Sequence, residues 1–271
     1  MTRRSGSDQG FEDLLEYIGD HLDFESGFYN DAYMDRRITA RMRRTDTDNY
    51  RAYRQLLERD DGEREELLDS LSINVTGFFR NPDAWDGLRS VLRELTSENR
   101  QVDVWSAPSA DGREPYSVAM LALDDSEIDA DRIDILGTDI NRDILRTARK
   151  GVYETSKTTD IVEELEPLSE IESYVDREGD AFEVRDRVKE MVRFEQHDLI
   201  RGDPKGTFDL ILCRNLLIYI DSSYKVPIFK TIRGSLRDGG HLMIGMTETI
   251  PTKMRDTFEP ADKQHRIYRK R

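Results

Sequence analysis

The first part of the chain has a hydrophobic pattern of helical period. Between residues 11 and 71, apolar residues recur three or four positions apart, as at Phe11, Leu14 and Ile18. This spacing places apolar side chains on one face of a helix, and no stretch of this part alternates as a strand does. We therefore predict a small bundle of helices that follows a frayed polar tail of residues 1–9.

After Asn81 and Pro82 the pattern changes to short apolar runs separated by helical stretches. We predict strands at 102–105, 133–136, 208–213, 241–245 and 265–269, helices at 85–95, 115–123, 142–150 and 224–236, and a turn at 238–240. Strands that alternate with helices favour a mostly parallel sheet with helices on both faces, which is an α/β fold. Residues 163–193 are highly charged with short alternating pieces, and we interpret them as an insertion.

Composition removes several classes of protein. The chain of 271 residues is 37 % hydrophobic and 36 % charged, the balance of a folded chain with a polar surface. A net charge of -15 argues against a general nucleic-acid binder, because phosphate binding requires a cationic surface. No apolar run approaches the ~20 residues of a membrane span, and the N-terminus has no signal core. We expect a cytoplasmic protein without membrane insertion.

The acidic and basic residues are unevenly chosen. The acids are 33 Asp and 23 Glu, whereas the bases are 32 Arg and only 9 Lys. Many short carboxylates with few lysines suit a chain that stays hydrated in concentrated salt, where screening weakens self-repulsion. We favour a halophilic source over an ordinary acidic cytosolic protein.

Ligands of such sheets bind at the carboxyl ends of the strands, and polar loops follow four of the predicted strands. These loops are 106–114, 137–139, 213–215 and 245–248. The first has a single glycine, Gly112, and lacks the glycine-rich dinucleotide fingerprint, so a ligand loop and a plain connection both remain open. The last either lines the same cleft or turns the chain.

Two residues at these strand ends allow a sharper choice. Asp139 is placed either to accept hydrogen bonds from both hydroxyls of a ribose or to cap the helix that begins near Asn141. Cys213 is a candidate nucleophile, but a small buried hydrophobe is the favoured interpretation. This lone cysteine also excludes an internal disulfide framework, and the four histidines have no metal-ligand spacing, so we expect no metal site.

The stretch N-V-T-G-F-F-R at 74–80 lies between the helical part and the sheet part. As a linker, it would be pinned by Phe78 and Phe79. As a lid over the cleft, it would contribute hydrogen bonds and one fixed cation, Arg80. Local sequence leaves both interpretations open.

Together these motifs resemble the CheR-type chemotaxis receptor methyltransferases. The matching stretches are N-V-T-G-F-F-R (74–80), W-S-A with G-R-E-P-Y-S (105–107 and 112–117), T-D-I (138–140), C-R-N-L-L-I-Y (213–219) and G-G with G-M-T-E (239–240 and 245–248). The resemblance covers roughly residues 10–270, and the five motifs occur in the order of the family.

The resemblance implies a fold and an activity. A helical N-terminal domain with its linker would span 10–81, followed at 82–271 by an S-adenosylmethionine-dependent methyltransferase domain. That domain would be Rossmann-like, with a seven-stranded, mostly parallel sheet and a small antiparallel β insertion at about 165–195. Members of the family are protein-glutamate O-methyltransferases: they methylate glutamate side chains on chemoreceptor signalling helices, without a metal, and release S-adenosylhomocysteine.

The resemblance also assigns site residues. The implied cofactor contacts are Asn74, Thr76, Arg80, Glu114, Asp139, Asp198, Leu199, Arg214 and Asn215. Arg80 and Tyr219 would lie near the transferred methyl group and the incoming carboxylate, which makes them the expected catalytic residues.

The chain departs from the pattern of the family at a few positions. Asp111 and Arg113 replace a Thr and a Glu in the first loop, and Asp198 stands where Asn is common. Pro108 replaces a small residue, and Met246 lies where His is usual. These departures bear on the fine contacts of the site rather than on the identity of the cofactor.

The helical part carries a basic segment that could bind a partner. Arg37, Arg41 and Arg44 share one helix face, and unmethylated receptor helices present acids, so we expect docking there. The alternative is a solvated face that pairs with local Asp residues. The turn at 176–180 is shorter than in relatives that bind a receptor tail, so we expect no dependence on a C-terminal tether. We also expect a monomer.

Two other functions remain open. One is a methyltransferase of the same fold that acts on another protein or on a small molecule. The other is a non-catalytic scaffold that senses the cofactor, an alternative that Arg113 keeps open. Turnover distinguishes the scaffold from both enzymes.

Overall fold

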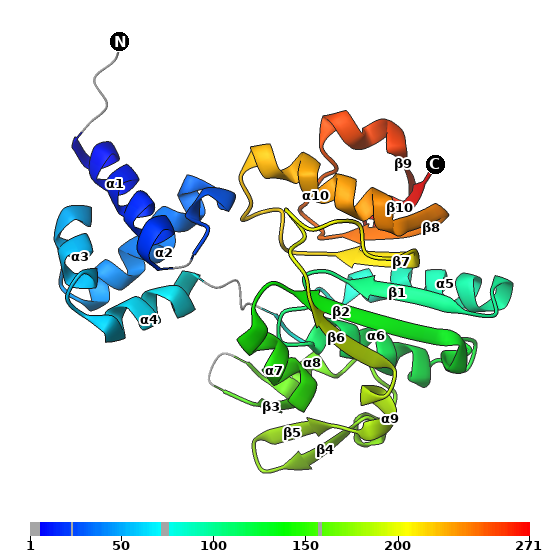
Figure 1. The fold of residues 1–271 in the computed structure, drawn as a ribbon. Helices are drawn as coiled ribbons and strands as arrows, with labels where there is room; N and C mark the ends of the chain where they lie inside the picture. The colour runs from blue at the N-terminus through cyan, green and yellow to red at the C-terminus, as the bar shows by residue number, and fades with distance from the viewer. Residues whose placement is uncertain (1–5, 23, 72–75, 157–158) are drawn as a thin grey trace. The chain divides into compact units, whose positions relative to one another are not determined.

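A computed structural model describes residues 6–22, 24–71, 76–156 and 159–271. The chain forms two compact units (Figure 1). Unit 1 is Met1–Ile73 with Tyr219–Lys225, and unit 2 is Asn74–Ile218 with Val226–Arg271. Residues 76–81, which we expected with the helical part, belong to unit 2, because Phe78 and Phe79 are buried in its core.

The elements follow the predicted order along the chain. The helices are α1 (Gly6–His21), η1 (Ser26–Phe28), α2 (Asp31–Arg44), α3 (Tyr50–Leu57), α4 (Asp61–Leu71), α5 (Asp83–Glu98), α6 (Arg113–Asp124), η2 (Ala130–Arg132), α7 (Arg142–Lys150), α8 (Ile161–Glu164), η3 (Ile171–Ser173), α9 (Asp186–Lys189), α10 (Ser222–Ser235) and η4 (Thr252–Thr257). The strands are β1 (Val102–Ser106), β2 (Ile133–Asp139), β3 (Val152–Glu154), β4 (Val175–Glu178), β5 (Ala181–Val184), β6 (Val192–Gln196), β7 (Phe208–Cys213), β8 (Leu236–Ile244), β9 (Phe258–Asp262) and β10 (Ile267–Lys270).

Unit 1 is the predicted helical bundle. Helix α1 packs on α3 and α2 packs on α4, around a core that contains Leu14, Ile38 and Leu67. Asn30 and Asn49 cap α2 and α3, since each side chain accepts a backbone N–H from three residues further on.

The segment Tyr219–Lys225 packs with unit 1 although it follows β7 in the chain. Ile220 forms an antiparallel bridge with Tyr29, and the N–H of Asp221 donates to the carbonyl of Phe28 at 2.9 Å. The ring of Tyr219 lies 4.9 Å from the ring of Tyr33. The first turn of α10 therefore belongs to unit 1 and the rest of the helix to unit 2.

Unit 2 is built on a mixed sheet of seven strands in the described part of the chain, in the order β6-β2-β1-β7-β8-β10-β9. The strands from β6 to β8 are parallel, and β10 runs antiparallel to both β8 and β9. The chain moves outward from β1 through β2 to β6, and then returns to β7 on the other side of β1. This reversal makes a topological switch point between β1 and β7, where α/β sheets bind ligands.

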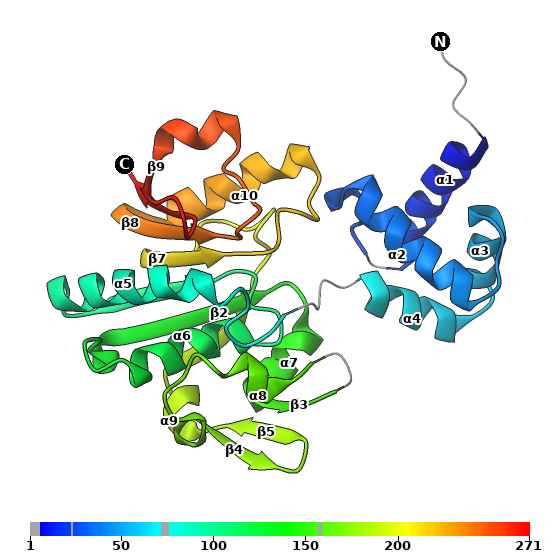
Figure 2. The same ribbon diagram turned by 180° about the vertical axis from the view of Figure 1, so that it is seen from behind.

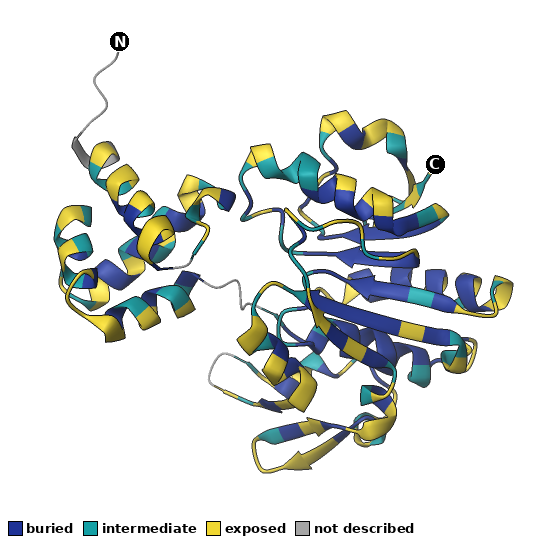
Figure 3. Ribbon diagram, viewed as in Figure 1, coloured by how far each residue is buried: buried dark blue, intermediate teal, exposed yellow. Residues whose placement is uncertain are grey.

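Side chains alternate between the two faces of this sheet. Val104 and Ile135 belong to a core that includes residues of α5, α6 and α7, while their neighbours Trp105 and Leu136 are buried on the opposite face. Figures 1 and 2 show α10 on one side of the sheet and α5 and α6 on the other. The central strands are buried almost throughout (Figure 3), as expected for a sheet covered on both faces.

Two local predictions were wrong. The insertion is an antiparallel sheet in the order β3-β5-β4, so it begins earlier than 165, and β6 at 192–196 is an edge strand of the main sheet. Arg193 and Glu195 on β6 are exposed and charged. Their charges made this edge strand look like part of the charged insertion in the sequence. The expected turn at 238–240 lies inside β8, because Gly239 (φ 78°) accommodates an irregular register against β7 rather than ending the strand.

Among the described helices, none is long and apolar enough to span a lipid bilayer.

Candidate active site

The loop after β1 is fixed by the two strands beside it. The N–H of Ala107 donates to the carbonyl of Leu212 at 2.9 Å, and the N–H of Ser109 donates to the carbonyl of Thr138 at 2.8 Å. Gly112 precedes α6 with φ 92°, and a Cβ there would come within 2.9 Å of neighbouring side chains, so this position requires glycine. The loop therefore lies across the carboxyl ends of β7 and β2, at the switch point.

Asp139 ends β2, and two backbone donors orient its carboxylate. The N–H of Ala110 donates to Oδ2 and the N–H of Asn141 to Oδ1, each at 3.0 Å. Each oxygen keeps a further lone pair, so the carboxylate can still accept hydrogen bonds from two adjacent hydroxyls. The alternative that Asp139 caps the next helix is wrong, because the side chain of Asn141 accepts from Asp143 and Ile144 and caps α7. Burial raises the pKa of Asp139.

An ion pair between Glu114 and Arg214 joins α6 to the loop after β7. Arg214 Nη1 lies 3.0 Å from Glu114 Oε2, and the hydroxyl of Ser106 donates to Glu114 Oε1 at 2.9 Å. Arg214 Nη2 donates to the carbonyl of Arg80 at 2.7 Å, and the guanidinium lies over the ring of Trp85. The Arg214 side chain is only 1 % exposed. Two of the expected cofactor contacts therefore hold each other in place.

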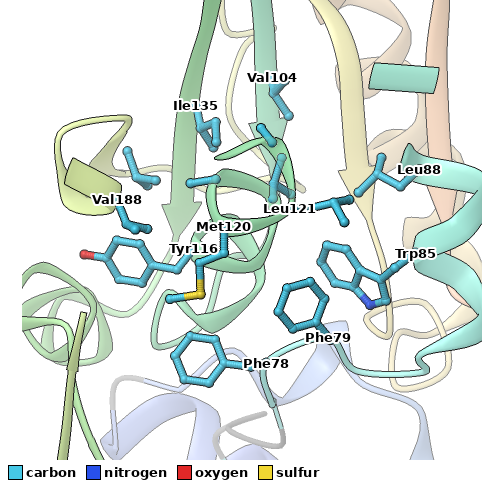
Figure 4. Close-up of a cluster of buried hydrophobic side chains, with 14 of the residues drawn as sticks. Phe78, Phe79, Trp85, Leu88, Val104, Tyr116, Met120, Leu121, Ile135 and Val188 are labelled. Atoms are coloured by element: carbon cyan, nitrogen blue, oxygen red, sulfur yellow. The ribbon is translucent and has the colours of Figure 1, made fainter. Parts of the chain in front are cut away.

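The described residues 76–81 are pinned to unit 2. Phe78 and Phe79 pack in the cluster that contains Trp85 and Tyr116 (Figure 4). The N–H of Phe79 donates to the hydroxyl of Ser117 at 3.0 Å, and the indole of Trp85 donates to the carbonyl of Arg80 at 3.1 Å. These contacts support the pinned-linker interpretation and fix the backbone that carries Arg80.

Arg113 forms ion pairs with two acidic side chains. Its guanidinium pairs with Asp111 at 3.0 Å and with Glu164 of α8 at 3.2 Å, and it lies over the ring of Tyr153. The N–H of Phe78 donates to the same oxygen of Glu164, Oε2, at 2.8 Å. The two departures in the loop therefore form part of one buried network that holds the start of α6 against the segment 76–81.

The sequence placed Glu248 in a candidate loop and in a family motif, but the side chain was given no role there. Its carboxylate is 3 % exposed and accepts backbone N–H groups from Gly245, Asn215 and Leu217 at 2.6, 3.1 and 2.7 Å. The loop 245–248 therefore neither simply turns the chain nor presents Glu248 to a cleft; it supports the loop after β7. A carboxylate shortly after a strand end was the available signal, but two of its backbone partners, Asn215 and Leu217, lie 33 and 31 residues away in the chain.

Asp198 and Leu199 follow β6, on the same edge of the sheet. Asp198 Oδ1 accepts the N–H groups of Ile200 and Arg201 at 2.8 and 3.0 Å, which orders this loop. Leu199 is 8 % exposed. The ring of His197 packs on Trp105, and burial lowers the pKa of this histidine, which favours the neutral imidazole.

The remaining predicted site residues lie in different parts of the molecule. Asn74 lies outside the described residues, and Thr76 is half-buried in unit 2. Asn215 has a positive φ of 58° at the turn of the loop after β7. Tyr219 belongs to unit 1. Cys213 is fully buried at the end of β7, and burial raises its pKa well above the ordinary value, which argues against a nucleophile.

The predicted docking face needs one correction. Arg41 is 7 % exposed and pairs with Glu63 at 2.5 Å and Glu66 at 2.8 Å, both on α4. It therefore holds the bundle together instead of facing a partner. Arg44 is exposed, and Arg37 is half-buried with its guanidinium over the ring of Tyr33.

No cluster of three or more His, Cys, Asp and Glu side chains among the described residues has the arrangement of a metal site. The chemistry-bearing groups at the carboxyl edge of unit 2 are instead Asp139, Glu114, Arg214 and Asn215.

The strand order and the switch point define unit 2 as a Rossmann-like α/β domain, a class that binds its ligands at the carboxyl ends of the strands. Family comparison is more specific. Residues 74–267 match the model described as the CheR methyltransferase, SAM binding domain, and residues 9–72 match the CheR methyltransferase, all-alpha domain. The chain belongs to the CheR methyltransferase family.

Several curated relatives span most of the chain. A chemotaxis protein methyltransferase of Listeria monocytogenes is 33 % identical over 89 % of this chain and 87 % of its own length. A probable chemotaxis protein methyltransferase of Rhizobium etli is 36 % identical over 82 % of this chain and 86 % of its own length. The chemotaxis protein methyltransferase of Borreliella burgdorferi is 33 % identical, with 74 % of each chain covered.

Proposed function

We propose that this protein transfers the methyl group of S-adenosylmethionine to glutamate side chains on the signalling helices of chemoreceptors. The products are glutamate methyl esters and S-adenosylhomocysteine. The observation that carries the proposal is the oriented carboxylate of Asp139 at the carboxyl end of β2, beside the Glu114–Arg214 pair at the switch point. Membership of the CheR family and the names of its relatives supply the class of substrate.

The residues at this edge fit the cofactor by their chemistry. Asp139 suits the ribose hydroxyls, because its backbone donors leave a lone pair on each oxygen. Glu114 suits the ammonium group of the methionine part, since a carboxylate accepts several hydrogen bonds and is held here by Arg214. Asp198 and Leu199 are assigned to the adenine, with Thr76, Asn74 and Asn215 as further contacts. When bound, the cofactor supplies a methyl group activated by its sulfonium.

The proposed transfer needs no strong base. A glutamate is ionised at neutral pH, so its carboxylate attacks directly: one O–C bond forms, one S–C bond breaks, and the electron pair stays on sulfur. The task of the protein is alignment and exclusion of water. We assign steering of the incoming carboxylate to Arg80, whose backbone is fixed by Trp85 and Arg214. The hydroxyl of Tyr219 is assigned to the geometry of the transferred group.

Docking of the receptor is assigned to the basic face of α2. Arg44 is exposed and Arg37 partly so, and both carry charge opposite to that of unmethylated receptor helices. The variant R37Q/R44Q should raise the KM for receptor and leave the affinity for S-adenosylhomocysteine unchanged. The control R51Q/R59Q removes the same charge from exposed positions elsewhere in unit 1. Equal effects of the two variants on the KM would show that receptor binding depends on net charge and not on this face of α2.

The proposal includes a monomer that acts in the cytoplasm, without nucleic acid and without a receptor tether. The turn between β4 and β5 consists of Gly179 and Asp180 alone, which supports independence from a tail peptide. Calorimetry with a receptor C-terminal peptide should show no tight binding, and sedimentation should give the mass of one chain. Tight peptide binding would overturn this part of the proposal.

The decisive experiment uses tritiated S-adenosylmethionine, receptor-bearing membranes and a range of salt concentrations. The wild type should place alkali-labile methyl groups on the receptor, and D139A should not. Binding of S-adenosylhomocysteine without receptor methylation would point to another substrate. A folded wild type that binds no S-adenosylhomocysteine would support the non-catalytic scaffold.

A further inference from the structure

Glu248 collects backbone donors from two loops that lie far apart in the chain. Its Oε2 accepts the N–H of Gly245 at 2.6 Å and the N–H of Asn215 at 3.1 Å, and its Oε1 accepts the N–H of Leu217 at 2.7 Å. Gly245 follows β8, while Asn215 and Leu217 follow β7. One side chain therefore ties together the carboxyl ends of two adjacent strands.

The arrangement requires a carboxylate at this position. Its two oxygens together accept these N–H groups without presenting a donor of their own, whereas an amide would turn an NH₂ group toward at least one backbone N–H. The surroundings also leave little room. A Cβ on residue 245 would lie 2.5 Å from Glu248 Oε2, so Gly245 is required by the close approach of the carboxylate.

The residues held by Glu248 carry the chemistry of the loop. Cys213 is fixed in β7 on one side, and Leu217 is fixed by Glu248 on the other. Between them lie Arg214, which pairs with Glu114, and Asn215, which adopts a positive φ of 58°. Asn is one of the few non-glycine residues that readily adopts this conformation, and the bond from Asn215 N–H to Glu248 fixes it there.

We propose that Glu248 is a positioning residue for cofactor binding and methyl transfer, acting through the backbone of Asn215 and Leu217 to set the places of Arg214 and Asn215. Glu248 itself touches neither cofactor nor receptor in this role. The proposal rests on the methyltransferase function given above, but its main readout, the affinity for S-adenosylhomocysteine, needs no receptor.

A substitution of Glu248 should affect cofactor affinity more than the stability of the fold. Burial raises the pKa of Glu248 above its ordinary value, although the N–H groups of Gly245, Leu217, Asn215 and Ile218 all lower it. An acid with a raised pKa in the folded state makes the fold less stable as the pH rises from the ordinary value through the raised one. The buried charge of the carboxylate therefore carries a cost in stability. A neutral amide avoids that cost but turns its NH₂ group toward a backbone N–H, and the two effects oppose each other.

The test compares E248Q, E248D and the control E178Q, which changes an exposed glutamate on β4. Calorimetry measures the affinity for S-adenosylhomocysteine, thermal denaturation measures stability, and steady-state kinetics separate kcat from the KM for S-adenosylmethionine. We expect E248Q to lose about tenfold or more in affinity, by analogy with the loss seen when the supporting partner of a metal ligand is removed, with a raised KM and a Tm close to wild type. E248D keeps the charge but is one methylene shorter, so its affinity for S-adenosylhomocysteine should lie between that of the wild type and that of E248Q.

The outcomes are distinct. Unchanged affinity in E248Q, or a loss of affinity that only follows a loss of folded protein, would overturn the proposal. Where E248Q does not fold, E248D is judged by the same measurements. Wild-type protein that binds S-adenosylhomocysteine but methylates no receptor would refute the proposed substrate and leave the role of Glu248 open to the same affinity test.

Discussion

Asp111 and Arg113, two residues apart at the start of α6, form an ion pair of 3.0 Å in which the side chains are only 14 % and 11 % exposed. Both positions depart from the motif of the family, where a Thr and a Glu are usual. The structure shows the departures as one change: an acid and a base introduced together, with their charges satisfied by each other and by Glu164. The loop is therefore altered in composition without an uncompensated charge.

This pairing predicts a non-additive response to substitution. R113E restores the usual residue of the family but places a third carboxylate beside Asp111 and Glu164. The repulsion among these like charges should weaken both folding and S-adenosylhomocysteine binding. D111T/R113E should recover part of both losses, with a coupling energy of about 0.5–3 kcal/mol. Chemical denaturation and calorimetry on the complete double-mutant cycle measure this term. Strictly additive effects would show that the two positions are independent.

Asp139 should make cofactor binding depend on pH. Burial raises its pKa above the ordinary 3.8, so protonation removes acceptors at a higher pH than for a solvated aspartate. The affinity for S-adenosylhomocysteine should therefore fall as the pH is lowered through the raised pKa. D139N should bind about 10–100-fold more weakly at neutral pH, since hydrogen bonds to charged groups contribute roughly 1.5–3 kcal/mol, and it should lack this component of the pH dependence.

The same group should act on stability with the opposite sign. Because the folded pKa is raised, the native state binds more protons than the unfolded state between pH 3.8 and the raised value, and this contribution to stability falls as the pH rises. The difference between wild type and D139N in denaturation experiments isolates the contribution from the rest of the acidic chain. A wild type that gains stability relative to D139N as the pH rises would contradict the assignment.

Arg214 should be irreplaceable by lysine. Its two terminal nitrogens reach Glu114 and the carbonyl of Arg80, and a single ammonium cannot reproduce that fork. R214K should lose about tenfold or more in S-adenosylhomocysteine affinity. R237K is a matched control, because Arg237 bridges Asp103 and Asp209 near the amino ends of β1 and β7. Calorimetry should show an effect of R214K that R237K lacks.

Arg41 should contribute to stability and not to the chemistry of unit 2. R41Q would leave the buried Glu63 without its cation, which costs about 3–5 kcal/mol in comparable buried pairs. R44Q, on the same helix but exposed, should change stability little. Denaturation of both variants measures the difference. Equal stabilities would restore Arg41 to the docking face.

Much of this architecture could be predicted from sequence because its signals are local. The apolar run of β7 and the periodic helix α7 occur at the expected residues. Asp139 was identified from its place after a strand, since parallel strands bring their carboxyl ends to one edge. The position of Arg41 could not be obtained in this way. Helical spacing defines which side chains share a face, but only the packing of α2 on α4 decides that this one meets Glu63.

The support of the site was hidden for the same physical reason. The carboxylate of Glu248 accepts N–H groups of a loop that follows a different strand. Because every residue except proline has a backbone N–H, the identity of the partner residues does not reveal such bonds in the sequence. Charge pairs such as Glu114 with Arg214 are likewise separated by 100 residues. Sequence patterns indicated which residues follow the strand ends at the carboxyl edge of the sheet, but not the contacts that hold them.

The return of Tyr219–Lys225 to unit 1 has a consequence for dissection of the molecule. The polypeptide passes between the two units three times, at 73/74, 218/219 and 225/226. A protease cut just before residue 76 would yield two fragments on a denaturing gel, yet the N-terminal fragment would still hold Ile220 through Tyr29 and Asp221 through Phe28. The nicked protein should therefore elute as one species, and a shortened chain that begins at residue 76 would carry an orphaned segment.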